Sequence, residues 1–209
     1  MRIAAPPLDE AFCEAQLCDL QALAAQPDDR EQRPCPGCDL VCPDCGSRGC
    51  TCKCRPDCPE APQRLSSEPE RFPIEPGILP LVYALSTLRL LPPCWSCEGH
   101  LDAAGQPQRL PSVWFISRKV IYPTLVADLL CRLKAGGEIA HGWQVATLNC
   151  GLETESVFAI EPRLQAGEDF QLGRLRNDVA VIAACLGEGV RSLAADRVAR
   201  LRVMLLERF

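Results

Sequence analysis

Residues 113–117 read Val-Trp-Phe-Ile-Ser, residues 143–149 read Trp-Gln-Val-Ala-Thr-Leu-Asn, and residues 156–161 read Ser-Val-Phe-Ala-Ile-Glu. All three stretches are rich in β-branched and aromatic residues, which is typical of β-strands. The second and third are separated by a short loop that contains Gly151, so we expect them to form an antiparallel hairpin.

Helices are predicted on either side of these strands. Leucines repeat at helical spacing over residues 78–91, and Pro92-Pro93 should end that helix. Pro123 can lie in the first turn of a helix that ends at Gly136-Gly137. Near the C-terminus, Gly187-Glu188-Gly189 interrupts an apolar stripe, which predicts a helical hairpin. The predicted fold class is α+β, with a small, mostly antiparallel sheet covered by helices.

Composition divides the chain into four parts. We expect an N-terminal helix in residues 1–25, a cysteine-rich metal-binding module in residues 26–60, a proline-rich linker in residues 61–76 and an α+β body in residues 77–209. The first 76 residues are rich in Pro, Cys, Asp and Arg, whereas the remainder is rich in Leu, Val and Ile. A hydrophobic core is therefore expected in the body.

The cellular compartment is predicted from the start of the chain and from its cysteines. The first residues lack the apolar run of a secretory signal, and the longest nearly uncharged stretch, Pro76 to Leu88, is shorter than the about 20 residues that cross a membrane. We therefore expect a cytoplasmic protein, in which thiols stay reduced and clustered cysteines bind metal. The odd total of 15 cysteines also argues against a fully disulfide-bonded scaffold.

Eight cysteines lie within one short run of the predicted metal-binding module. They are Cys35, Cys38, Cys42, Cys45, Cys50, Cys52, Cys54 and Cys58. The only large apolar side chains in this run are those of Leu40 and Val41, so burial cannot compensate for the loss of chain entropy on ordering. Bonds to metal ions are the expected source of order.

Two segments of the run resemble zinc knuckles, tight turns in which two thiolates converge on one ion. They are Cys35-Pro-Gly-Cys38 and Cys42-Pro-Asp-Cys45-Gly46. Eight thiolates suffice for about two tetrahedral zinc sites of four ligands each. Which four cysteines belong to each site is left open.

Iron–sulfur chemistry is the alternative for the same cysteines. The spacing Cys38-x-x-x-Cys42-x-x-Cys45 resembles that of radical S-adenosylmethionine enzymes, although Asp44 stands where those enzymes usually have an aromatic residue. Cys42 and Cys58 each precede proline, as in ferredoxin-type electron carriers. The Cys-x-Cys steps resemble those of metallothioneins, which implies a metal store as a third option, but here the cluster is tied to a large folded body. The cysteine spacing and the two Cys-Pro steps thus leave an iron–sulfur electron carrier or assembly factor as the alternative function.

A second candidate site is the segment Cys94-Trp-Ser-Cys97-Glu98-Gly-His100, which we expect to be a compact loop. Cys94, Cys97 and His100 could hold a third metal ion. Its fourth ligand would be water or one of three more distant side chains, namely Cys131, His141 and Cys150. The same segment could instead be a redox or nucleophilic cysteine site, or a tight turn with buried cysteines.

Residues 96–100, Ser-Cys-Glu-Gly-His, are followed after a turn by Pro-Ser-Val-Trp-Phe at residues 111–115. This arrangement resembles a loop-then-strand element of uncharacterised bacterial proteins. The resemblance covers about twenty residues and implies no known activity; it implies a shaped loop at a sheet end.

The expected function is that of a zinc-binding protein whose cysteine cluster is a structural or docking module for a protein partner. Residues 28–58 hold five basic and six acidic residues, so no cationic surface for nucleic acid is expected. The alternative is an enzyme with a pocket at Cys97, Glu98 and His100. In it, a metal-bound water or the Cys97 thiolate attacks the substrate while Glu98 or His100 moves protons.

Overall fold

The computed structural model describes residues 10–26, 65–68, 70–88, 90–150, 155–164 and 171–206. Apart from Gln26, the predicted cysteine-rich module lies outside these ranges. The helices are α1 (Glu10–Ala24), α3 (Leu79–Thr87), α4 (Ile121–Ala135) and α5 (Leu172–Leu206). The strands are β1 (Pro93–Cys97), β2 (His100–Leu101), β3 (Pro107–Arg109), β4 (Ser112–Ser117), β5 (Trp143–Cys150) and β6 (Ser156–Pro162).

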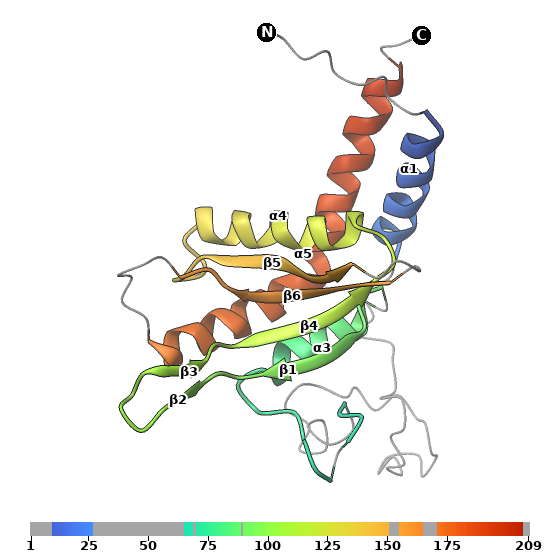
Figure 1. The fold of residues 1–209 in the computed structure, drawn as a ribbon. Helices are drawn as coiled ribbons and strands as arrows, with labels where there is room; N and C mark the ends of the chain where they lie inside the picture. The colour runs from blue at the N-terminus through green and yellow to red at the C-terminus, as the bar shows by residue number, and fades with distance from the viewer. Residues whose placement is uncertain are drawn as a thin grey trace, which may run out of the picture.

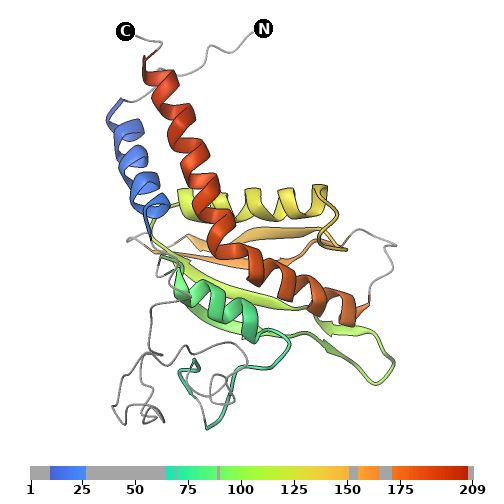
Figure 2. The same ribbon diagram turned by 180° about the vertical axis from the view of Figure 1, so that it is seen from behind.

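Four strands form one antiparallel sheet in the order β1-β4-β6-β5, and β2 and β3 form a separate two-stranded ribbon. The helices α3 and α5 lie across one face of the sheet (Figures 1 and 2). Phe115 of β4 and Phe158 and Ile160 of β6 belong to the same buried core as the helices. This arrangement confirms the α+β class, and the pairing of β5 with β6 confirms the predicted hairpin.

The expectation that residues 94–100 form a compact loop was wrong. Residues 93–97 are the edge strand β1, residue 100 begins β2, and only Glu98 and Gly99 lie between them. Proline is tolerated at the first residue of an edge strand, and pairing with β4 supplies partners for the backbone of this cysteine- and tryptophan-containing segment. The partner strand β4 is nearly twenty residues further along the chain, so the local propensity of residues 93–97 did not indicate a strand.

The predicted C-terminal helical hairpin was also wrong, because α5 is a single helix of 35 residues. Its buried stripe passes from Leu186 to Val190 without a change of phase. A Cβ atom at Gly189 would lie 2.5 Å from Leu129 Cδ1, so this glycine permits close approach of α4. Packing between α4 and α5 offsets the low helix propensity of glycine, about 1 kcal/mol relative to alanine.

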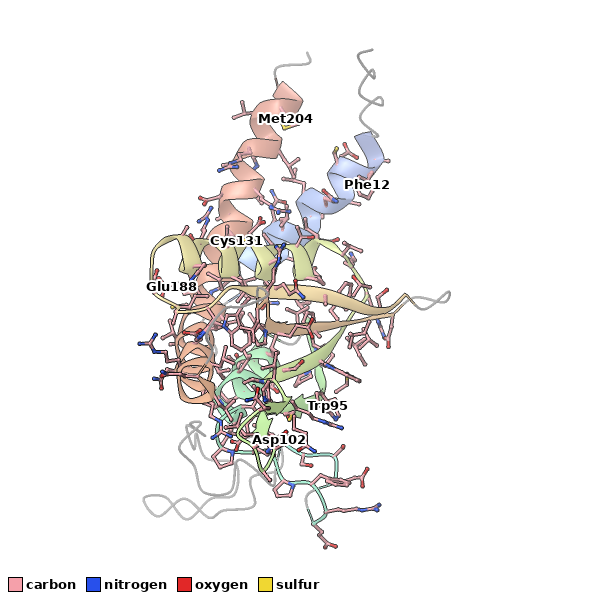
Figure 3. The ribbon with its side chains drawn as sticks, turned by 60° about the vertical axis from the view of Figure 1, so that its left-hand side comes forward. Phe12, Trp95, Asp102, Cys131, Glu188 and Met204 are labelled. Atoms are coloured by element: carbon pink, nitrogen blue, oxygen red, sulfur yellow. The ribbon has the colours of Figure 1, made fainter. Side chains whose placement is uncertain are left out.

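Helix α5 therefore has two halves with different surroundings. Residues 172–188, its N-terminal half, lie across the face of the sheet that is turned to the viewer in Figure 2, whereas much of residues 189–206, its C-terminal half, projects beyond the sheet beside α1. Leu20 and Leu23 of α1 are buried in the same core as the body. Phe12 and Met204, exposed by 59% and 43%, lie near the outer end of this helix pair (Figure 3).

Among the described helices, none combines the length and the apolar character required to cross a membrane.

Candidate metal centre

Three potential metal ligands converge at the end of the sheet where α5 begins. A carboxylate oxygen of Glu75, the thiol sulfur of Cys97 and an imidazole nitrogen of His100 all lie within 4.8 Å of one another. Glu75 Oε1 and His100 Nε2 are 2.8 Å apart, and both side chains are partly exposed, by 34% and 42%. Cys97 is buried. The group therefore combines one oxygen, one sulfur and one nitrogen donor at a solvent-accessible position.

Each donor comes from a different local structure. Glu75 opens the turn before α3, where its backbone oxygen accepts hydrogen bonds from the amides of Ile78 and Leu79. Cys97 ends β1, and His100 begins β2. Gly99 turns the chain between the two strands with a positive φ of 86°, a conformation that side chains other than glycine rarely adopt.

The turn at Gly99 is closely packed as well as sharply bent. A Cβ atom there would lie 2.8 Å from both Leu172 Cδ1 and Pro111 Cδ. The start of α5 and the residue before β4 therefore press on the backbone of this turn from two sides. This packing holds Cys97 and His100 in a fixed relation.

Glu98 and Arg176 attach the turn to α5. Arg176 Nη2 donates hydrogen bonds to Glu98 Oε1 at 2.7 Å and to the Gly99 carbonyl at 3.0 Å. Its Nε donates to the Glu98 carbonyl at 3.3 Å. One guanidinium thus contacts two consecutive carbonyl groups and a carboxylate, and it restricts the backbone that positions the neighbouring donors.

The Glu75 segment is joined to the same turn. The second carboxylate oxygen of Glu98 accepts a 2.6 Å hydrogen bond from the amide of Gly77, and the amide of Glu98 donates to Glu75 Oε2 at 2.7 Å. A side chain at Gly77 would meet Glu98 Oε2 at 2.7 Å, so the absence of a Cβ allows this contact. Glu75 is therefore oriented through one carboxylate oxygen while the other faces His100.

The environment of Cys97 favours its protonated form in the absence of metal. Burial is the main reason that the pKa of the Cys97 thiol is raised, and the charges of Glu75 and Glu98 raise it further. The Gly99 amide, which hydrogen-bonds the sulfur, and the charge of Arg109 act in the opposite direction. A bound metal ion would supply the positive charge needed to deprotonate this thiol.

An aromatic pair lies beside the group on the sheet. Trp95 and Trp114 are directly paired across β1 and β4, with ring centroids 4.6 Å apart. The Arg109 guanidinium lies 5.8 Å from the centre of the Trp95 ring, and Arg109 pairs with His100 in the β2–β3 ribbon. A cation and two indole rings thus border the candidate centre.

The structure brings together only part of the predicted third metal site. Cys97 and His100 are joined by Glu75, whereas Cys94 is exposed at a register shift in β1 and is not part of the group. Of the suggested fourth ligands, Cys131 is exposed on α4 and His141 is engaged with Asp178. The eight cysteines of residues 35–58 lie outside the described residues, and so does the side chain of Cys150.

Two important residues of this region were missed from the sequence. Glu75 lies 22 residues before Cys97, between Ile74 and Pro76, in a segment that was assigned to the linker. Arg176 lies in a helix 78 residues after Glu98. Neither belongs to a short motif. The only available signal was the position of Glu75 just before a predicted helix, which does not by itself indicate a ligand.

A second polar network is centred on Asp178, two residues after Arg176 on α5, and it is almost completely buried. Asp178 accepts hydrogen bonds from the backbone amides of Ala140 and His141, from His141 Nδ1 at 2.9 Å and from Trp143 Nε1 at 3.2 Å. The His141 and Asp178 side chains are each only 5% exposed. This network fastens the connection between α4 and β5 to α5.

Comparison with known proteins identifies no relative: no family model, no curated protein and no solved structure matches the chain. The resemblance of residues 96–100 and 111–115 to uncharacterised bacterial proteins stays a prediction.

Proposed function

We propose that this chain is a zinc-binding protein with a mononuclear site at Glu75, Cys97 and His100 and further zinc in the cysteine cluster of residues 35–58. The observation that carries the proposal is the convergence, within 4.8 Å, of oxygen, sulfur and nitrogen donors from separate segments. Zinc accepts all three donor types and has no geometric preference of its own from d-electrons.

The dimensions of the group require only small side-chain adjustments for zinc. Tetrahedral bonds of the usual lengths place oxygen and nitrogen ligands about 3.3 Å apart and put sulfur slightly further away. Glu75 Oε1 and His100 Nε2, now 2.8 Å apart, would separate slightly, and Cys97 Sγ already lies within 4.8 Å of both partners. These are rotations of side chains, while the backbone stays held by Arg176 and Gly99.

The contacts around Cys97 favour a metal ligand over a cysteine nucleophile. A nucleophilic cysteine needs a lowered pKa, whereas burial raises the pKa of Cys97. Glu98, the suggested proton carrier, has both carboxylate oxygens engaged by Gly77 and Arg176. The metal-dependent form of the enzyme alternative is therefore favoured over the thiol-dependent form.

The cysteine cluster is proposed as a structural or docking module for a protein partner in the cytoplasm. The support for this proposal is the sequence. The eight thiols have very few apolar residues between them, which favours order through bound metal, and the nearly balanced charges argue against a nucleic-acid partner. The iron–sulfur alternative would make the protein an electron carrier or assembly factor, and it predicts a brown protein rather than a colourless one.

The test is metal analysis of the full chain purified under anaerobic, reducing conditions. Eight cluster thiolates and the mononuclear group predict about three zinc ions per chain, and Cys97→Ser should remove one of them. Cys94→Ser, which changes an exposed thiol three residues away, is the matched control and should retain all of them. Circular dichroism would verify that both variants are folded.

Equal metal content in the wild type and Cys97→Ser would exclude the mononuclear site. Iron and inorganic sulfide in the purified protein would show that the cysteine cluster binds an iron–sulfur centre and not zinc. Glu75→Gln provides a second variant of the mononuclear site that leaves the β1 strand unchanged, and it should lower zinc affinity without altering the cluster.

A further inference from the structure

Ser112 has a buried hydroxyl group without a hydrogen-bond partner. The residue is 8% exposed, and its Oγ is the one buried side-chain oxygen or nitrogen of the described residues that has no partner. Leaving such a group unpaired in a protein interior costs about 1–3 kcal/mol. An unpaired buried hydroxyl therefore points to a ligand that would complete its hydrogen bonding.

The location of Ser112 connects it with the candidate metal centre. Ser112 on β4 is the direct partner of Cys97 on β1. Directly opposed residues of an antiparallel pair project to the same face of the sheet, with Cβ atoms about 4.5–5.5 Å apart. The unpaired hydroxyl thus lies beside the thiol, on the face that also presents Trp95 and Trp114.

We infer that the metal keeps its fourth coordination position for an exogenous ligand, an inference that rests on the proposed zinc site. Ser112 Oγ hydrogen-bonds that ligand. Three protein ligands with water in the fourth position are typical of catalytic rather than structural zinc. Among the described residues, no fourth cysteine, histidine or acidic donor joins the group. The partial exposure of Glu75 and His100 gives solvent access.

The surroundings indicate which molecules replace the water. Arg109 places a guanidinium over Trp95 and is the ribbon partner of His100, so the border of the site is cationic and aromatic. Small molecules with a carboxylate or other anionic group, next to a flat or apolar part, fit this border. The inferred ligand class is therefore a small organic anion that binds the metal directly.

Cobalt substitution of the full chain allows a test with azide and acetate as probes. Cobalt in the cysteine cluster also absorbs light, so the difference spectrum between the wild type and Cys97→Ser isolates the mononuclear site. Azide, and more weakly acetate, should shift this difference spectrum in a saturable way. Ser112→Ala should keep the cobalt absorption but bind azide about 2- to 10-fold more weakly, as expected for the loss of one hydrogen bond.

The control is Ser96→Ala, which removes a hydroxyl from the opposite face of β1 and should leave azide affinity unchanged. A null difference spectrum between the wild type and Cys97→Ser would overturn the zinc site itself. Cobalt bands that are present but insensitive to azide and acetate would show that the chain fills the fourth position, and would overturn the inference while retaining the site. Equal azide affinity in the wild type and Ser112→Ala would overturn the role of Ser112.

Discussion

The two halves of α5 use the same secondary structure in different ways. In the N-terminal half, Arg176 and Asp178 project polar groups into the body, where they hold the turn at Gly99 and the connection before β5. In the C-terminal half, Val190, Leu193 and Ala194 are buried, while polar pairs such as Arg132–Asp196 stay at the surface. The polar contacts of the first half are therefore harder to replace than those of the second.

This difference follows from solvation. Water can substitute for a lost partner at the surface, so an exposed ion pair contributes little to stability. A group buried within the body has no such substitute, and removing its partner leaves an unsatisfied charge or donor. The following variants test this contrast along one helix, in order of decreasing effect.

Asp178→Ala should produce the largest loss of stability, about 3–5 kcal/mol, because it leaves buried donors of His141 and Trp143 without an acceptor. Chemical denaturation would measure the change. Asp178→Asn retains one acceptor oxygen and should lose less. If Asp178→Ala lowered the free energy of unfolding by less than about 1 kcal/mol, the buried polar contacts of the N-terminal half would contribute no more than the exposed ion pairs of the C-terminal half.

Arg176→Met keeps much of the apolar stem but loses the guanidinium contacts with Glu98 and Gly99. Stability should fall by about 1–2 kcal/mol, because these groups are only partly exposed. Zinc affinity at the mononuclear site should fall about 10- to 100-fold, as for other residues that orient metal ligands. Arg174→Met, an exposed position on the same helix, is the matched control. An unchanged zinc affinity in a folded Arg176→Met protein would contradict the positioning role.

Gly189→Ala tests the junction between the halves. The added methyl group would meet the Leu129 side chain, at a cost of about 1–3 kcal/mol, partly offset by a gain of about 1 kcal/mol in helix propensity. The net result should be a loss of about 1 kcal/mol. Gly173→Ala, which would meet no atom within 4 Å, should be neutral or stabilising. The same sign for both substitutions in denaturation experiments would rule out close packing as the reason for glycine at position 189.

Asp196→Ala should have the smallest effect, about 0–1 kcal/mol, because its pair with Arg132 is about half exposed on both sides. Raising the salt concentration should reduce the effect further. A loss comparable to that of Asp178→Ala would show that the surface pairs of the C-terminal half contribute as much as the buried network.

Part of the fold followed from local patterns. The alternating and β-branched residues of β4, β5 and β6 predicted strands, and Pro123 and Gly136 marked the ends of the helix between β4 and β5. The single helix α5 could also have been predicted, since the apolar stripe keeps its phase from Leu186 to Val190. Glycine in a helix costs only about 1 kcal/mol relative to alanine, which the packing of α5 on α4 offsets.

The candidate site was only partly predictable. The short spacing of Cys97 and His100 pointed to two ligands, but the same reasoning included Cys94. In a strand, residues three apart are separated by about 10 Å, so the conformation of β1 separates Cys94 from the group. Glu75 has no spacing relation to Cys97, and its approach depends on the Glu98 and Arg176 hydrogen bonds.

Local patterns were enough to predict strands β4, β5 and β6, the concentration of thiols in residues 35–58 and the short spacing of Cys97 and His100, because each of these depends on neighbours along the chain. Folding of the whole body made residues 93–97 an edge strand and brought Glu75, Ser112 and Arg176 around one turn. Those outcomes depend on packing and hydrogen bonds between distant segments, and such contacts leave no local pattern in the sequence.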